Sequence, residues 1–326
     1  TGQHTEDSMN KVLLNQLGLP DVYKQYELSN KKNKIGIYDN LLYNGNVTVF
    51  ELYNISDKLL CVDPENLGQV GEIIKYLLID INKLDPHYLM IFGDVTSTLA
   101  GAIASKISKR KLIHVESGLR SFDMTMPEEV NRIIVDYYSD ILLATQKSGY
   151  ENLQKCNLKG NVYLINNPMI EFLKIFENII INTKIHTKYN LQSKNYIVAT
   201  LHRPNNVDDL DKLNNIYEEL NMLCDNYEII FPVHPRTKKN VEKLNIQNDR
   251  IKLIDPLDYI NFISLIYDSF AVITDSGGIQ EETTYLKVPC YTYRTTTERP
   301  DTLVQNGGTN KLINKISIDL FSNINV

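Results

Sequence analysis

The sequence predicts an α/β protein of two doubly wound domains, each a parallel sheet covered by helices, that face a central cleft. Three observations lead to this prediction. The chain has 326 residues, more than one hydrophobic core usually serves, so two domains of about 150 residues each are expected. Short apolar runs alternate with amphipathic helical patterns, which is typical of parallel strands joined by crossover helices. Charged or glycine-rich segments follow five of these runs, where open parallel sheets bind ligands.

The predicted strands fall into two series. Four lie in the first half, at 88–92, 111–115, 140–144 and 161–165. Five lie in the second half, at 195–201, 227–233, 251–254, 270–274 and 288–293. A helical and then polar stretch separates the series, so we expect an N-terminal domain at 1–166 and a C-terminal domain at 167–326.

The segment 33–60 does not fit the alternation of strands and helices. It contains strand-like runs on either side of Asn44-Gly45, a pair that favours a tight hairpin turn. We therefore expect an inserted β element in the N-terminal domain.

Composition restricts the classes of function. Hydrophobic residues make up 43% of the chain and charged residues 23%, which is ordinary for a globular protein. The net charge of −6 predicts no broad basic surface for nucleic acid. The four cysteines are widely spaced and suggest neither a metal-binding pair nor a disulfide framework. With no apolar run near the ~18 residues of a membrane span and no signal-peptide pattern, we expect a cytoplasmic protein without membrane partners.

Two acidic residues follow predicted strands in the first half. Asp94 follows the strand 88–92 after one glycine, and Glu116 comes directly after the strand 111–115. A carboxylate at the mouth of a core is costly unless it is paired, so both are candidates for chemistry. Both also have a structural alternative, because Asp94 could cap the next helix and Glu116 could pair with Arg120.

A third carboxylate, Glu128, begins a helical pattern. The stretch from Thr125 to Glu128 fits a capping box, with Pro127 in the first turn. On spacing alone this favours a structural role for Glu128.

Two histidines follow strands in the second half. His202 is followed by Arg203, and His234 is followed two residues later by Arg236. A single histidine is more often packed or hydrogen-bonded than catalytic. Their matching positions next to arginines nevertheless favour an anion site.

The stretch "TDSGGIQEETTYLKVPC" places Ser276, Gly277 and Gly278 where a strand leads into a helix, with Glu281 and Glu282 on that helix. Helix chemistry alone could explain this pattern, because serine caps free amides and acidic residues complement the helix dipole. Glycines also let the backbone approach a phosphate at a helix N-terminus, and a carboxylate one turn later can bind ribose hydroxyls. Both explanations stay open at this point.

Six motifs, in one order, resemble the non-hydrolysing UDP-N-acetylglucosamine 2-epimerases. They are "FGDVTSTLAGA", "HVESGLRSFDMTMPEEVNRIIVD", "TLHRPNNVD", "FPVHPRT", "TDSGGIQEETTYLKVPC" and "TTERPDTL…GGTNKL". The resemblance runs from about Asp85 to Leu312, and the first twenty residues also resemble this family. It implies two Rossmann-like, doubly wound domains in a glycosyltransferase-B-like arrangement, with the nucleotide held mainly by the C-terminal domain.

Carried over residue by residue, the resemblance implies a site in two parts. Asp94, Glu116 and Glu128 would face the hexose, and His202 would lie near the diphosphate. The resemblance assigns the nucleotide to the following residues: Phe262 against uracil, Glu282 on the ribose, and Ser276, Gly277, Gly278, Arg299 and His234.

The reaction that the resemblance implies inverts C2 of a UDP-N-acetylhexosamine by eliminating UDP to a 2-acetamidoglucal and adding UDP back while C2 receives a proton on the other face. It needs no metal or other cofactor. Carboxylates suit this chemistry as bases on either face and as partners of a positively charged ring, while arginine and helix amides suit the departing diphosphate. The resemblance also implies a homodimer and a role in polysaccharide synthesis.

Three other functions stay open. A hydrolysing epimerase would release free N-acetylmannosamine, and a glycosyltransferase of the same architecture would transfer the sugar to an acceptor. A catalytically silent sensor would bind UDP without turnover, although the intact acidic set argues against it.

The chain departs from the family pattern at three places. Many relatives have His-Arg-Arg-Glu where this chain has Pro204-Asn205 after the arginine. Relatives also begin with a strand and a G-[TA]-R-P turn, which are not found before Thr1, and they usually end with a further helix. Because the first strand of a doubly wound sheet usually lies in its middle, we expect residues before Thr1 to supply it or the segment 33–60 to substitute for it.

Overall fold

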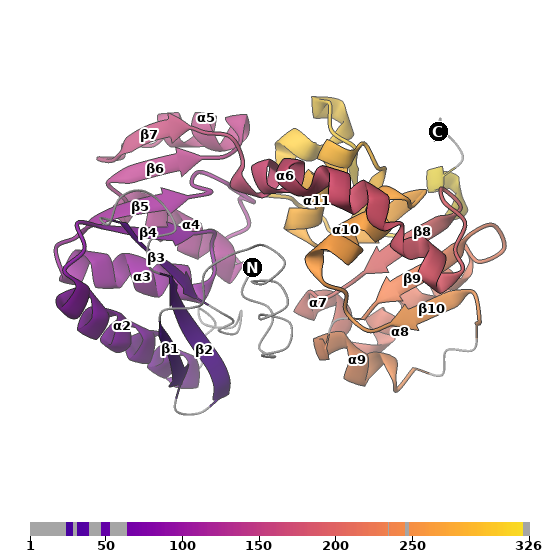
Figure 1. The fold of residues 1–326 in the computed structure, drawn as a ribbon, viewed down its shortest axis with the longest axis horizontal. Coiled ribbons are helices and arrows are strands. Elements are labelled where there is room, and N and C mark those ends of the chain that lie inside the picture. Colours follow the sequence, from indigo (N-terminus) through magenta and orange to yellow (C-terminus); the bar gives the residue numbers. More distant parts are fainter. Residues whose placement is uncertain are drawn as a thin grey trace. The chain divides into compact units, whose positions relative to one another are not determined.

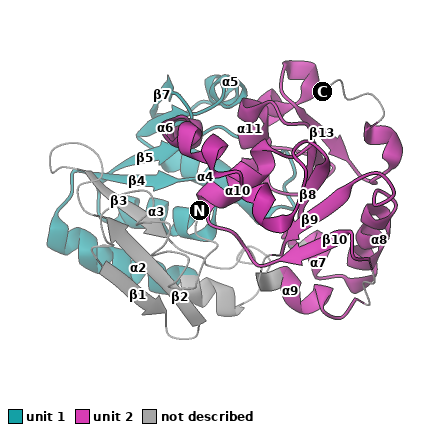
Figure 2. Cartoon of the chain, turned by 45° about the vertical axis from the view of Figure 1, so that its right-hand side comes forward, with its two compact units in different colours: residues 1–167 teal, residues 168–326 magenta. Residues whose placement is uncertain are grey.

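The computed structural model describes residues 64–233, 235–244 and 248–321, and the backbone of three strands at 24–28, 31–38 and 47–52; side chains are described from Val70 onward, except at 204, 235 and 236. The chain divides into two compact units, Thr1–Asn167 and Pro168–Val326 (Figure 2). Within the described residues, no helix combines the length and apolar character that crossing a membrane requires.

Unit 1 contains one sheet with seven described strands in chain order. They are β1 (Lys24–Leu28), β2 (Lys31–Tyr38), β3 (Val47–Leu52), β4 (Tyr88–Phe92), β5 (Lys111–Val115), β6 (Ile141–Ala144) and β7 (Asn161–Leu164). The first three strands pair antiparallel, and β3 to β7 pair parallel (Figure 1). The helices of this unit are α2 (Pro64–Leu84), α3 (Thr96–Ile107), α4 (Pro127–Tyr138) and α5 (Lys147–Lys155).

The segment 33–60 contributes β3 and most of β2 to this sheet. Strand β3 lies parallel beside β4, as expected if this segment provides a substitute strand. The other neighbour of β3 is the antiparallel β2. The parallel strands β3 to β7 lie in the sheet in the order in which they occur in the chain. The predicted turn at Asn44-Gly45 lies outside the described residues.

The core of unit 1 is formed where α2 and α3 pack with β4 and β5. Ile73, Leu77 and Ile81 are buried at a spacing of four residues on α2, which aligns them on one helix face. Gly101 of α3 is close to β4, because a Cβ there would lie 2.9 Å from the side chain of Ile91. Helix α3 is thus held tightly against the strand that leads to Asp94.

Unit 2 contains a wholly parallel six-stranded sheet in the order β10-β9-β8-β11-β12-β13. Its strands are β8 (Tyr196–Thr200), β9 (Glu228–Pro232), β10 (Ile251–Ile254), β11 (Ala271–Thr274), β12 (Cys290–Tyr293) and β13 (Asn310–Ile313). Its helices are α6 (Pro168–Thr183), α7 (Pro204–Val207), α8 (Leu210–Asn221), α9 (Pro235–Val241), α10 (Tyr259–Tyr267) and α11 (Gly277–Leu286). The order reverses between β8 and β11, as in a doubly wound sheet.

Both faces of this sheet are covered. Ile197 and Ala199 of β8 pack in one apolar cluster, which includes α8, and Val198 packs in a second cluster with α6, α10 and α11 (Figure 1). Successive side chains of a strand point to opposite faces, so a strand between two layers of helices must be apolar throughout. This explains why the strands of unit 2 were visible as continuous apolar runs.

The nine predicted strands are confirmed. Three of them have the predicted bounds, at 88–92, 111–115 and 251–254, and the others are one or two residues shorter. Strand β13 was missed, because its sequence "NKLI" contains only two apolar residues.

Candidate active site

The strand ends of β8 and β11 meet where the order of the unit 2 sheet reverses. The two strands are parallel neighbours, with Thr200 opposite Thr274. The chain segments after such strands lead to helices on opposite faces, which opens a crevice at the carboxyl ends. His202 follows β8, and Asp275 and Ser276 follow β11.

Asp275 is fully buried at this position. Its carboxylate accepts hydrogen bonds from the backbone N–H groups of His202 and Arg203, the latter at 2.9 Å, and from the amide of Asn206 at 3.0 Å. Its Oδ1 also lies 3.0 Å from Nδ1 of His202. Burial alone would raise the pKa of Asp275, but His202, Asn206 and Arg203 outweigh it and lower the pKa to about 2.

Helix α11 begins at Gly277, with Ser276 as its N-cap residue. The hydroxyl of Ser276 forms no capping hydrogen bond, and the first turn carries no acidic residue. Helix chemistry alone therefore does not explain this stretch. Ser276 does not cap the helix, and Glu281 and Glu282 lie beyond its first turn.

The two glycines of α11 differ in their surroundings. A Cβ at Gly277 would overlap the carboxylate of Glu298. Among the described residues, a Cβ at Gly278 would meet only the side chain of Met169, at 3.7 Å, an ordinary contact. A side chain at 277 would thus have to displace the Glu298 carboxylate, whereas one at 278 would not disturb the described packing.

The remaining predicted nucleotide residues lie on α11, on α10 and in the segment before β13. Glu282 is buried, and this burial raises its pKa to about 7. Arg299 forms an ion pair with Glu281. Phe262 is half-buried in the first turn of α10. His234 lies outside the described residues.

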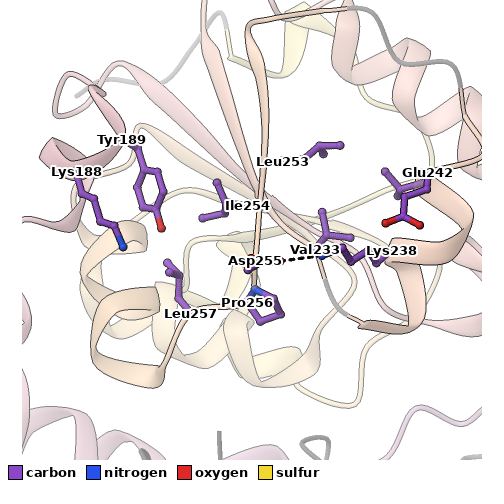
Figure 3. A pocket seen from close by; sticks show the side chains of 11 residues that line it. Lys188, Tyr189, Val233, Lys238, Glu242, Leu253, Ile254, Asp255, Pro256 and Leu257 are labelled. Carbon is purple, nitrogen blue, oxygen red and sulfur yellow. Dashed lines mark hydrogen bonds and ion pairs between the residues drawn. The ribbon is translucent and has the colours of Figure 1, made fainter. Parts of the chain in front are cut away.

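A hollow of about 560 Å³ lies beside this region, between Tyr189, the carboxyl ends of β9 and β10, and α9 (Figure 3). On one side Lys238 bridges to Asp255 at 2.9 Å, the dashed line in Figure 3. None of the described site residues lines this hollow.

In unit 1, Asp94 and Glu116 follow neighbouring strands. Phe92, at the end of β4, is opposite Val115, at the end of β5. The Oε2 atom of Glu116 lies 3.7 Å from the position of a Cβ on Gly93, which places both acidic residues at one sheet edge. Glu116 has a φ of 67°, a conformation that costs energy for a non-glycine residue and is often found at functional sites.

Asp94 is held by Arg132 of α4. Nε and Nη2 of Arg132 donate to Oδ2 of Asp94 at 2.9 and 2.5 Å, and Nη1 donates to Glu129 at 2.7 Å. The side chain of Arg132 is only 2% exposed. The capping alternative for Asp94 is wrong, because Val95 is the N-cap residue of α3 and makes no side-chain cap.

The predicted capping box at Glu128 is also wrong. Helix α4 begins at Pro127, and its N-cap residue is Met126, which has no capping side chain. The hydroxyl of Thr125 donates instead to Asp123, at 2.6 Å. The Thr125 hydroxyl, which a capping box would direct to the first turn of α4, is thus engaged in the preceding turn.

His114 and Asp136 form a second buried contact behind the two acidic residues. Nδ1 of His114 lies 2.7 Å from Asp136, and its Nε2 lies 2.9 Å from the carbonyl oxygen of Gly93. Arg120, the structural partner considered for Glu116, pairs with Asp136 at 2.7 Å. Burial would raise the pKa of Asp136, but His114 and Arg120 lower it overall.

The sequence profile of a family described as UDP-N-acetylglucosamine 2-epimerase matches residues 39–319. The chain belongs to this family. It is therefore an enzyme of the isomerase class.

Curated relatives of this epimerase cover most of the chain. A UDP-N-acetylglucosamine 2-epimerase of Methanocaldococcus jannaschii is 33% identical over 321 residues, which cover 93% of this chain and 77% of the relative. A UDP-N-acetylglucosamine 2-epimerase homolog of Methanococcus maripaludis is 38% identical over 265 residues, which cover 78% of this chain and 72% of the relative. A UDP-2,3-diacetamido-2,3-dideoxy-D-glucuronate 2-epimerase of Pseudomonas aeruginosa is 32% identical over 303 residues, or 91% and 75%.

Solved structures support the same fold. The M. jannaschii UDP-GlcNAc 2-epimerase, solved with UDP-GlcNAc and UDP, has a TM-score of 0.76 and 31% identity, and the match covers 96% of this chain and 79% of that one. S. aureus MnaA, solved with UDP, has a TM-score of 0.70 and 30% identity, with 82% and 71% covered. The predicted glycosyltransferase-B-like fold class, with two parallel-strand sheets, is confirmed.

Five polar residues that support the candidate site of this epimerase were not predicted from the sequence: Arg132, Glu129, His114, Asp136 and Asp275. All five are buried, and all lie within the quoted motifs. A charged residue in an otherwise apolar strand or on the inner face of a helix is costly unless it is paired, and this signal could have identified them.

Proposed function

We propose that this epimerase interconverts UDP-N-acetylglucosamine and UDP-N-acetylmannosamine without net hydrolysis, by anti elimination of UDP and re-addition. The observation that carries the proposal is the pair of acidic residues, Asp94 and Glu116, at the ends of neighbouring strands. The M. jannaschii structure with UDP-GlcNAc and UDP supports this choice of substrate.

The proposed chemistry needs carboxylates because the hydrogen at C2 is not acidic. Its removal must accompany cleavage of the C1–O bond, so that a C1–C2 double bond forms as UDP leaves. A carboxylate takes the C2 proton, and re-addition of UDP with a proton on the opposite face gives the epimer. Asp94, Glu116 and Glu128 would share these proton transfers and stabilise positive charge on the ring.

The proposed nucleotide site lies in unit 2. The first turn of α11 is not capped by Ser276, and uncapped N–H groups at a helix N-terminus suit a diphosphate. Gly278 leaves room for close approach of a ligand. Glu282 would accept hydrogen bonds from the ribose, Phe262 would contact the uracil, and Arg299 and His202 would stand near the diphosphate.

The deciding experiment incubates the protein with UDP-N-acetylglucosamine in deuterated water and follows the products by NMR. We expect UDP-N-acetylmannosamine, with deuterium at C2 of both sugars, because elimination exchanges this hydrogen with solvent. Epimerisation without deuterium would exclude the elimination route. Accumulation of free N-acetylmannosamine would instead establish the hydrolysing alternative.

A second candidate substrate follows from the P. aeruginosa relative, which is named for a diacetamido uronate. The same experiment with that sugar nucleotide separates the two, since the true substrate should have the higher kcat/KM.

We further propose a cytoplasmic homodimer that supplies sugar nucleotide for polysaccharide synthesis; a monomeric mass in light scattering would exclude the dimer.

A further inference from the structure

His202 and Asp275 form a buried contact that the proposed function does not yet use. The two residues follow β8 and β11, the neighbouring strands at which the order of the unit 2 sheet reverses. Nδ1 of His202 lies 3.0 Å from Oδ1 of Asp275. The histidine side chain is 21% exposed and the aspartate is fully buried, so of the two only the histidine is accessible to a ligand.

The orientation of the Asp275 carboxylate is determined by donors from the segment after β8. The backbone N–H groups of His202 and Arg203 and the amide of Asn206 all donate to it. Arg203 also donates through Nε to the carbonyl oxygen of Asp275, at 3.0 Å. These contacts hold Oδ1 at the histidine ring.

This geometry selects one form of the histidine. An ionised carboxylate only accepts hydrogen bonds, and the pKa of Asp275 is lowered to about 2, so the proton of the contact belongs to Nδ1 of His202. Which nitrogen of a neutral imidazole carries the proton is set by the hydrogen bond that the other ring nitrogen makes. In the neutral ring Nε2 is then the acceptor, and in the charged ring the buried carboxylate balances the positive charge.

We propose that Asp275 is a positioning residue for His202: its carboxylate accepts the hydrogen bond from Nδ1–H and balances the charge of the protonated ring, so that Nε2–H is turned toward the diphosphate of the substrate and can donate to it. The proposal rests on the nucleotide site described under Proposed function.

The first test needs no turnover. Imidazole nitrogens of the 15N-histidine-labelled full chain are observed by NMR at alkaline pH, where neutral rings prevail, and the signals of His202 are identified by their loss in His202→Gln. We expect the Nδ1–H tautomer in the wild-type protein. The Nε2–H tautomer would overturn the proposal.

The second test compares two variants. Asp275→Asn should lower kcat by on the order of 10²-fold or more, with little change in KM, because wrong tautomers and lost orientation have such effects in related histidine–aspartate pairs. The control is Thr237→Val, which removes a buried hydrogen bond of 2.9 Å to Leu201, next to His202, without contacting the pair. A loss of kcat no greater in Asp275→Asn than in this control would contradict the positioning role.

The two tests separate this inference from the proposed function. If the wild-type protein shows the Nδ1–H tautomer but epimerises no UDP-sugar, the proposed function fails and the pairing of the two residues stands. If Asp275→Asn does not fold, the tautomer of His202 in the wild-type protein still tests the proposed positioning role.

Discussion

Glu282 is a carboxylic acid surrounded by protein on α11. Its burial raises the pKa from 4.5 to about 7, so the folded protein binds this proton more tightly than the unfolded chain does. Stability from this group is therefore fully present below about pH 4.5 and is lost as the pH rises to about 7. Above this window the folded state carries a buried charge.

We predict that Glu282→Gln removes this pH dependence. Between pH 5.5 and 8 the free energy of unfolding of the wild-type protein should fall by about 2 kcal/mol relative to that of the variant. Urea unfolding at the two pH values measures the difference. Glu218→Gln, on the exposed face of α8, controls for the substitution, and a difference independent of pH would contradict the prediction.

Helix α4 connects the charged residues of unit 1. Its residues Glu129, Asn131, Arg132 and Asp136 are buried, and Arg132 and Asp136 reach the ends of β4 and β5 through Asp94 and His114. Glu129 accepts hydrogen bonds from the backbone of the loop that follows β5. The helix thus orients both the loop and the proposed catalytic carboxylate.

Arg132→Met should destabilise the protein by about 3–5 kcal/mol, because it leaves the carboxylates of Asp94 and Glu129 without this buried partner. The control is Lys147→Ala, which removes an exposed ion pair with Glu151 on α5 at 3.7 Å and should cost no more than about 0.5 kcal/mol. Chemical denaturation measures both variants. Equal losses would show that the buried pair adds no stability.

Gly118→Ala tests the turn after β5. Gly118 has a φ of +80°, and a Cβ there would overlap the carbonyl oxygen of Gly149 and lie 2.7 Å from Leu153. We predict a loss of roughly 2–5 kcal/mol from backbone strain and overpacking.

The matched variant for Gly118 is Gly71→Ala on α2. No described atom lies within 4 Å of a Cβ at this position, so the change should raise stability by about 1 kcal/mol. Thermal unfolding compares the two substitutions. A Gly118→Ala protein as stable as the wild type would show that this turn tolerates a side chain.

At the scale of the whole molecule, the proposal assigns the hexose to unit 1 and the nucleotide to unit 2. Glu282→Ala should weaken UDP binding by roughly 1–3 kcal/mol, the value of a charge-assisted hydrogen bond. Glu116→Gln should abolish turnover and leave the affinity for UDP nearly unchanged. Calorimetry with UDP tests both, and equal losses of affinity would exclude this division.

Local sequence patterns were enough to predict the strands and the positions of the candidate site residues. The strands 88–92 and 111–115 were visible as short, mainly apolar runs between helical patterns. Glu116 and His202 stood out because each directly follows such a run, and Asp94 because only Gly93 separates it from one. These patterns depend only on neighbouring residues, so they can be recognised without the structure.

The partners of those residues depend on the folding of distant segments against one another. Arg132 reaches Asp94 across 38 positions of the chain, and Asp275 reaches His202 across 73. The tertiary structure also decided that Thr125 bonds to Asp123 instead of capping α4, and that β3 lies beside β4. The physical reason is that burial and ion pairing depend on which elements pack together, and the local periodicity of a segment carries no record of its distant neighbours.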